Sequence, residues 1–523
     1  EVRPLYIAVA EPRIEGRAGI ENSELMAAAV RVALQRSLVS LVGASPINAE
    51  ALDALDGAPL ERARSLGVDE LVMSTVDCVP DACHVAVSRV RTADGSVVWT
   101  RGLPVPSDDL WLLARAVENH LSQAFPGLER REGFPELKVS GGDYAEYHRL
   151  RRASRERRLP PAELLEGVGK LLDRSPDFLE AILFEAFILR ERFLTDRDPG
   201  DIDLAVDRLA AARRLAPNDP RPLATLFEVQ LAASRPEEAQ RVLEELEELA
   251  PASSAVLVGQ ARLHELRGQP DLALDAMRRA VRFQPSRPWL HRLAEMEMRT
   301  GDMDAVRATL GALLERFPGD EPGLALLAQL ELLAGSVERS AEIFERLTAE
   351  RQDFARLTNL GVARLLLDQP DRAAESFRAA LDLAPGNAYA RLNLADALVL
   401  TGDDDNARRH YTGVIEALDL ASSATDWQAL TVRAQALAHL GRRQEALYNV
   451  AAGLELAPRH PQAVLEASLV RALLGDRDEA LELAVRALEL GVEPRWLQLP
   501  WFEDIRRMPP LSQLLDDGAG GPG

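Results

Sequence analysis

Cys78 and Cys83 are the only cysteines in this chain of 523 residues, and Val-Pro-Asp-Ala separates them between two strand-like runs. A tight connection there would place them opposite each other, as a disulfide requires. The alternatives are two buried free thiols, or a metal or redox site. A zinc site is weakly supported, because Cys78, Cys83 and His84 supply only three of its four usual ligands. We favour the disulfide, which indicates a periplasmic or extracellular location, with a cytoplasmic location as the alternative.

The other residues that could take part in catalysis form no catalytic arrangement. The eight histidines are scattered without paired-ligand spacing, and most are expected to be solvated. HExxH, GxSxG, P-loop, GxGxxG and kinase motifs are absent from the sequence. Lys138 and Lys170 are the only lysines, which leaves few candidates for a catalytic lysine. We therefore predict that this chain is not an enzyme and that it needs no metal or cofactor.

Composition narrows the classes of partner. The formal net charge of −22 repels phosphate backbones and anionic lipid headgroups, so nucleic acid and bare membrane are poor partners. No apolar run is long enough to cross a bilayer, and no signal peptide is visible at the start. Because the chain begins at Glu1, we expect that upstream domains were removed; the alternative is a trimmed or mature protein.

Residues 1 to about 125 alternate between strand-like and helix-like stretches. The β-rich runs cover residues 4–9, 70–76, 84–90 and 97–101. The expected helices cover residues 23–41, 60–66 and 108–124. Asp94-Gly95 predicts a hairpin between the last two runs, and Ser107-Asp-Asp predicts the cap of the last helix. The cysteines therefore belong to an α/β domain, with a mixed sheet and flanking helices.

From about residue 144 the sequence repeats. Pro217, Pro251, Pro285 and Pro318 follow one another at intervals of 34, 34 and 33 residues, and Pro385 comes two periods later. Alanines keep the same period at Ala205, Ala239, Ala273, Ala305, Ala373, Ala407, Ala446 and Ala480. Small residues let two helices approach closely, and proline ends the second of them. Each period therefore predicts a pair of amphipathic helices.

The clearest copy contains Gly361, Ala373, Phe377, Ala380 and Pro385 and resembles the tetratricopeptide repeat family. The resemblance covers residues 141 to 494, in about ten motifs, and implies an all-α superhelical solenoid that binds proteins. Most motifs carry a leucine where the family commonly has an aromatic residue early in the first helix. Leucine fills the same space, so the expected architecture is unchanged.

The amino-terminal residues are similar to the TolB amino-terminal-like domain. The segments that carry this resemblance are Tyr6-Ile-Ala-Val9, Ala63-Arg-Ser-Leu-Gly67-Val-Asp-Glu-Leu-Val72 and Thr92-Ala-Asp-Gly95-Ser-Val-Val-Trp99. Ala10-Glu11-Pro12 replaces the family's aromatic end of the first strand, so a binding role for that edge is not carried over. Such domains followed by tetratricopeptide repeats resemble the sensory halves of bacterial receptor-like serine/threonine kinases, cyclases and winged-helix regulators.

In peptide-binding tetratricopeptide proteins the first helices line a groove, and asparagines at one repeated position can hold the ligand backbone. Asn359 and Asn393 occupy that position in adjacent motifs. The remaining expected partner-binding residues are Tyr389, Asp396, Gln428 and Gln435 nearby, and a basic patch of Arg262, His291, Arg292 and Arg299 upstream. The alternative is that all of them are ordinary polar residues in contact with water.

The expected domain boundaries follow from these patterns. Residues 126–143 are rich in glycine and proline and predict a linker, and residues 144–494 form the repeat array. Residues 495–517 are expected to cap the array, with the aromatics from Trp496 to Phe502 covering its last apolar surface; an exposed aromatic docking site is the alternative. The Gly-rich residues 518–523 are expected to be disordered.

Together these observations predict an interaction module that binds a polypeptide. The leading hypothesis is a sensory half that relays binding to an effector upstream of Glu1, kinase-like in the first instance and tethered through a membrane helix. The second hypothesis is a periplasmic scaffold for envelope or secretion machinery without an effector. A fused enzyme whose catalytic half lies outside this sequence is a third and weaker possibility.

Overall fold

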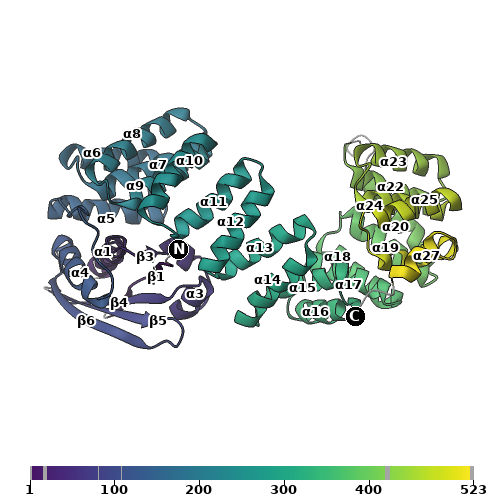
Figure 1. The fold of residues 1–523 in the computed structure, drawn as a ribbon, viewed down its shortest axis with the longest axis horizontal. Helices are drawn as coiled ribbons and strands as arrows, with labels where there is room; N and C mark the ends of the chain where they lie inside the picture. Colours follow the sequence, from purple (N-terminus) through teal and green to yellow (C-terminus); the bar gives the residue numbers. More distant parts are fainter. Residues whose placement is uncertain (1–2, 16–19, 80–81, 108, 419–424, 519–523) are drawn as a thin grey trace. The chain divides into compact units, whose positions relative to one another are not determined.

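The computed structural model of the protein describes residues 3–15, 20–79, 82–107, 109–418 and 425–518. The chain divides into two compact units, Glu1–Gly301 and Asp302–Gly523, called here the first and the second unit. The first unit contains a mixed β-sheet and the helices up to α13, and the second contains the helices from α14 onward (Figure 1).

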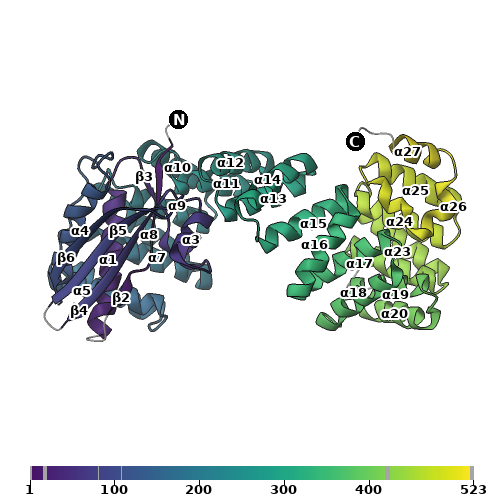
Figure 2. The same cartoon turned by 90° about the horizontal axis from the view of Figure 1, so that it is seen from below.

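The sheet lies at the start of the first unit. Its strands are β1 (Leu5–Val9), β2 (Arg13–Glu15), β3 (Ala44–Pro46), β4 (Glu70–Val79), β5 (Ala82–Arg91) and β6 (Val97–Pro106). They follow the order β3-β1-β4-β5-β6, with β2 paired to β4. Pairing is parallel among β1 to β4 and antiparallel from β4 to β6, which confirms the predicted mixed sheet (Figure 2).

Four helices cover the sheet. They are α1 (Ile20–Val39), α2 (Ala49–Asp53), α3 (Pro59–Ser65) and α4 (Leu110–Ala124). α1 and α4 pack on one face, where Val76 and Val85 point inward with the alternation of a half-buried strand. Within the predicted Ser107-Asp-Asp cap, Asp109 is the N-cap of α4, and its carboxylate accepts the backbone N–H of Leu112. The elements that the sequence did not predict, β2, β3 and α2, span three to five residues, too few to show a period.

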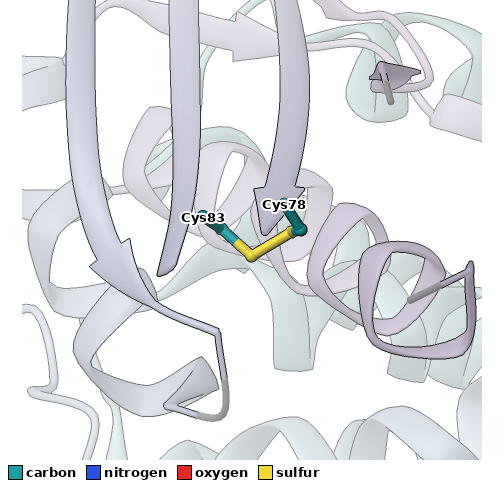
Figure 3. The surroundings of a disulfide bond; sticks show 2 residues. All are labelled: Cys78 and Cys83. Carbon is teal, nitrogen blue, oxygen red and sulfur yellow. A yellow bond between two sulfur atoms is a disulfide. The ribbon is translucent and has the colours of Figure 1, made fainter. Parts of the chain in front are cut away.

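Cys78 and Cys83 lie opposite each other on β4 and β5 and are joined by a disulfide (Figure 3). Both side chains are buried in the core beneath α1. The pair closes a very short loop, because only five positions separate the two residues. A short loop restricts the unfolded chain little, so the bridge stabilises the domain only modestly.

We expect reduction of this disulfide to lower the free energy of unfolding by about 2 kcal/mol or less, because the closed loop is short. Purified protein should have a mass lower by about two hydrogens than the reduced chain, measured by intact mass spectrometry. Denaturant unfolding with and without reductant measures the stability difference. Full alkylation of both thiols in unreduced, denatured protein would contradict the bridge and weaken the extracytoplasmic assignment.

The rest of the chain is helical. In the first unit the helices are α5 (Gly141–Arg155), α6 (Pro161–Arg174), α7 (Leu179–Asp196), α8 (Pro199–Leu215), α9 (Pro220–Ala232), α10 (Pro236–Leu249), α11 (Ser254–Leu266), α12 (Pro270–Phe283) and α13 (Arg287–Thr300). In the second they are α14 (Met303–Arg316), α15 (Glu321–Ala334), α16 (Val337–Glu350), α17 (Phe354–Leu366), α18 (Pro370–Leu383), α19 (Ala388–Leu400), α20 (Asp404–Ala417), α22 (Trp427–His439), α23 (Arg443–Leu456), α24 (Pro461–Leu473) and α25 (Arg477–Glu489). Within the described residues of the two units, nine hairpins form from α5 to α12 and from α15 to α25.

Local sequence signals set the ends of these helices. Ser253, Ser286 and Asp320 are N-caps whose side chains accept a backbone N–H from the first turn. Proline follows at the first helical positions of many helices, where its missing N–H costs nothing. Gly441, which has a φ of 76°, lies in the turn between the two helices of its hairpin, where a left-handed residue is needed. Asp368 adopts the same conformation in an equivalent turn.

Close helix contacts hold each hairpin together. Gly361 on α17 faces the ring of Phe377 on α18 so closely that an added Cβ would overlap the ring. Ala373, Phe377 and Ala380 on α18 are fully buried. The small residues recognised in the sequence therefore lie where the two helices of a hairpin approach each other most closely.

Residues 126–143 do not act as a free spacer in the first unit. Phe134 and Leu137 are buried, and Arg131 donates to the Leu249 carbonyl at 2.9 Å. The hydroxyl of Tyr6 donates to the Ala252 carbonyl at 2.8 Å. These contacts join the α/β part to the turns that follow the second helices, and one hydrophobic core runs from the sheet into the first hairpins. The sequence favoured a linker here because glycine and proline suggest flexibility, whereas tertiary contacts order the segment.

Candidate partner-binding surfaces

The first helices of successive hairpins form a continuous layer. In the first unit α9 contacts both α7 and α11, and in the second unit α15, α17, α19, α22 and α24 each contact the next. We call the face of this layer that points away from the second helices the inner face. Side chains on it come from repeated positions along the sequence, so they form rows.

Asn359 and Asn393 belong to one such row in the second unit. Asn359 lies two positions before Gly361, and Asn393 two positions before Ala395. Two helical residues turn through about 200°, so both amides lie on the side opposite the second helices. Both are half-buried, and neither amide hydrogen bonds any other described residue. The row therefore offers two amide groups with free hydrogen-bonding capacity.

Glu466 on α24 occupies the same register, two positions before the small residue Ser468. Its carboxylate accepts the hydroxyl of Thr431 and the amide of Gln462, the latter at 3.0 Å. Burial raises the pKa of the Glu466 carboxyl. The sequence analysis missed this residue, although the spacing to Ser468 contained the signal.

Tyr389 and Gln428 are exposed, as a binding role requires. The Tyr389 side chain remains 38% exposed on α19. Burial of part of the ring, together with the negative charges of Asp426 and Glu466, raises the pKa of the Tyr389 phenol. The phenol therefore lies near two carboxylates of the following inner helices. This end of the inner face combines an aromatic ring, amides and acidic groups.

Asp396 and Gln435 do not line an open surface, which corrects the sequence-based expectation. Their exposed fractions are 4% and 7%. Asp396 accepts the hydroxyl of Tyr411 and the amide of Gln435, both at 2.8 Å. The ring of His439 stacks on Tyr411 at 4.4 Å, and its Nε2 lies 3.6 Å from Asp396. The sequence could not reveal this burial because Tyr411 comes from the second helix of the hairpin.

Burial sets the charge of this cluster. It raises the pKa of Asp396 to about 7, against the hydrogen bonds from Tyr411 and Gln435 that favour the carboxylate. It lowers the pKa of His439 to about 4, so the imidazole is neutral at physiological pH. His148 in the first unit is also buried, with a pKa lowered to about 3. These two histidines are therefore exceptions to the expectation that most histidines are solvated.

The expected basic patch of the first unit is neutralised by acidic neighbours. Arg262 donates twice to Glu228, at 2.5 and 3.1 Å, and Arg292 donates to Glu265. Of the other two expected residues, His291 is half-buried and Arg299 is exposed. Each of these glutamates lies one hairpin before its arginine, so sequence proximity did not reveal the pairing. This face of the first unit is an ion-pair ladder rather than a basic surface.

The aromatic segment after α25 packs onto the last hairpin. Leu497 and Phe502 are fully buried against Val464 and Leu465 of α24, whereas Trp496 and Trp501 are half-buried. This packing is what an end cap requires. The predicted disordered tail falls mainly on residues 519–523, which lie outside the described residues.

Two segments of the chain match a known protein family. Residues 225–288 and residues 364–430 each match a family model described as tetratricopeptide repeat. The first match covers α9 to α12 and the second runs from the end of α17 into α22. The chain therefore contains segments that match the tetratricopeptide repeat. Tetratricopeptide repeats mediate protein–protein interaction, and these matches agree with the predicted solenoid and with a non-catalytic repeat region.

Two curated relatives carry the name cellulose synthase operon protein C. The protein from Pseudomonas fluorescens (strain SBW25) is 26% identical over 326 residues, which cover 55% of this chain and 25% of the relative. The protein from Xanthomonas axonopodis pv. citri (strain 306) is 28% identical over 256 residues, covering 44% of this chain and 17% of the relative. The present chain thus spans a quarter or less of these relatives.

Several solved structures are similar to parts of this chain. One is a tetratricopeptide repeat protein from Parabacteroides merdae ATCC 43184, 15% identical, with a TM-score of 0.38 over 51% of this chain and 98% of that one. Among the described residues, no helix is long and apolar enough to cross a membrane. Within the same part of the chain, no three histidine, cysteine, aspartate or glutamate side chains gather as a metal site.

Proposed function

We propose that this chain is a scaffold that binds an extended polypeptide along the inner face of α17 to α24. The observation that carries the proposal is the pair Asn359 and Asn393. They occupy the same position in adjacent repeats, and neither amide forms a hydrogen bond to a described residue. A side-chain amide donates and accepts at once, so it matches the backbone of an extended peptide. Tyr389 and Gln428 extend the same surface.

The contrast between the two units supports this location. In the first unit Glu228 and Arg262 satisfy each other along the inner layer. A partner there would first have to break ion pairs. The second unit offers neutral amides and an exposed phenol instead. A partner that binds these two amides breaks no hydrogen bond between them and the described residues.

The comparisons favour a scaffold over a sensory relay. Both curated relatives are named as products of a cellulose synthase operon, which supports assembly with other proteins. Relay to a kinase-like effector or another upstream domain stays a prediction. The Cys78–Cys83 disulfide supports an extracytoplasmic location, because such bonds persist in oxidising compartments.

Replacing both amides tests the proposal. We expect Asn359→Ala with Asn393→Ala to weaken binding of the natural partner roughly 5- to 150-fold, since each lost hydrogen bond contributes about 0.5 to 1.5 kcal/mol. Quantitative pulldown from envelope extract compares the variant with the wild type, and titration of each captured protein gives its affinity. The melting temperature should stay nearly unchanged, because neither amide forms a hydrogen bond to a described residue.

Gln352→Ala is the matched control, since this exposed amide lies between α16 and α17 and outside the row. The control should capture the same proteins with wild-type affinity. An identical set of partners and affinities for the double variant would place the binding surface elsewhere. The α/β part of the first unit would then be the next surface to test.

A further inference from the structure

The segment after the last hairpin reaches much further than an end cap needs to. It contains η1 (Pro494–Gln498) and η2 (Pro500–Phe502), followed by α26 (Glu503–Arg506) and α27 (Leu511–Gly518). Within the second unit, η1 contacts α17 and η2 contacts α24. Two complete hairpins, α19–α20 and α22–α23, lie between these two helices along the chain. The segment therefore spans several hairpins.

Arg495 makes the longest of these connections. Its Nη1 donates to the carbonyls of Glu331 at 3.3 Å, Leu332 at 3.4 Å and Gly335 at 2.7 Å. These carbonyls lie at the carboxyl end of α15, where the last turn has no intrahelical donors left. A cation there also meets the negative end of the helix dipole. The guanidinium thus caps a helix 160 residues earlier in the sequence.

Trp501 makes a second connection on the same layer of first helices. Its ring lies edge-on to His439, with 6.5 Å between centroids, at the end of α22. His439 in turn stacks on Tyr411 of α20. Arg506 holds the segment in shape by donating to the Gln498 carbonyl at 3.0 Å. Separate contacts therefore hold the two ends of the segment, at Arg495 and at Trp501.

We propose that residues 494–502 act as a clasp that fixes the curvature of the second unit from α15 to α24. In a repeat array each hairpin contacts only its neighbours, so small rotations between hairpins add up along the array. A link between the α15 end and the α24 end restrains all of those rotations together. The clasp sets the spacing of the inner-face rows, and opening it changes the surface offered to a partner.

Distance measurements between two spin labels test the clasp. Arg346 on α16 and Glu482 on α25 are exposed, so cysteines at these positions can carry labels in the full-length protein. Cys78 and Cys83 remain unlabelled because they are bonded and buried. We expect one narrow distance distribution in the otherwise unchanged protein. Arg495→Ala should replace it with a broad distribution, and Arg495→Lys should give an intermediate width.

Arg507→Ala is the matched control, because this arginine is 85% exposed and its ion pair, at 3.6 Å, is with the neighbouring Glu503. It should retain the narrow distribution. If Arg495→Ala does not fold, Arg495→Lys decides, since an ammonium keeps the charge with fewer donors. An unchanged narrow distribution in folded Arg495→Ala, and also after adding Trp501→Ala, would overturn the clasp. This readout needs no partner, so it is independent of the proposed binding function.

Discussion

Arg36→Ala is expected to destabilise the first unit by roughly 3 to 5 kcal/mol, the cost of breaking a buried ion pair from one side. The Arg36 side chain is 4% exposed, and its Nε donates to Glu180 at 2.8 Å. The same guanidinium also donates to Glu118 and to the Pro135 carbonyl. Its removal leaves two buried carboxylates, on α4 and α7, without their shared cation.

The pattern of the loss is as informative as its size. Arg36 lies on α1, and its partners lie on α4, on α7 and in residues 126–143. Hydrogen exchange should therefore show the sheet and the first hairpins losing protection together. Arg149→Ala is the control, because that arginine is 61% exposed and its pair with Glu146 is worth at most about 1 kcal/mol. If the variant lost protection from hydrogen exchange only in residues 1–125, the sheet and the first hairpins would not unfold as one cooperative unit.

Asp396→Asn is expected to stabilise the second unit at pH 8 by up to about 4 kcal/mol, and hardly at all at pH 4. Burial raises the pKa of Asp396 from 3.8 to about 7, so the folded protein holds a proton that the unfolded chain releases. Stability therefore falls as the pH rises from about 4 to about 7, and the full cost is present above that. Asparagine is neutral throughout and keeps the oxygen that accepts the Tyr411 hydroxyl.

Chemical denaturation at several pH values measures this effect as a difference between wild type and variant. His439 changes the free energy of unfolding with pH in the opposite direction. Its pKa is lowered from 6.5 to about 4, so its burial makes the protein less stable as the pH falls below 6.5. That contribution is common to both proteins and cancels to first order in the difference. Asp382→Asn on exposed α18 surface serves as the control. A stability difference independent of pH would show that Asp396 is ionised in the folded protein.

Much of the fold could be predicted from local sequence. Pro251 and Pro285 each follow the end of a second helix, as their period predicts. Ala373 and Ala407 are buried where the two helices of a hairpin are in contact. The strands and the cysteine pair could be predicted for the same reason. In each case the interacting residues lie within one period or one hairpin of each other.

The candidate binding residues were predicted less evenly. The positions of Asn359 and Asn393 follow from the register of Gly361 and Ala395, and the structure leaves both amides half-buried without described partners. Asp396 occupies an equally regular position, yet Tyr411 buries it. Periodicity assigns a side chain to a face of its helix. It does not say what the neighbouring helix brings to that face.

The sequence by itself determined that the chain is an α/β domain followed by helical hairpins, because helix periods, caps and turns are set by residues close together in the chain. Only the tertiary structure decided which charged groups are buried and which segments join distant repeats. Arg36 meets Glu180, and Arg495 meets the end of α15, across more than a hundred residues. Such contacts depend on how hairpins stack, and stacking sums many small rotations that no local pattern records.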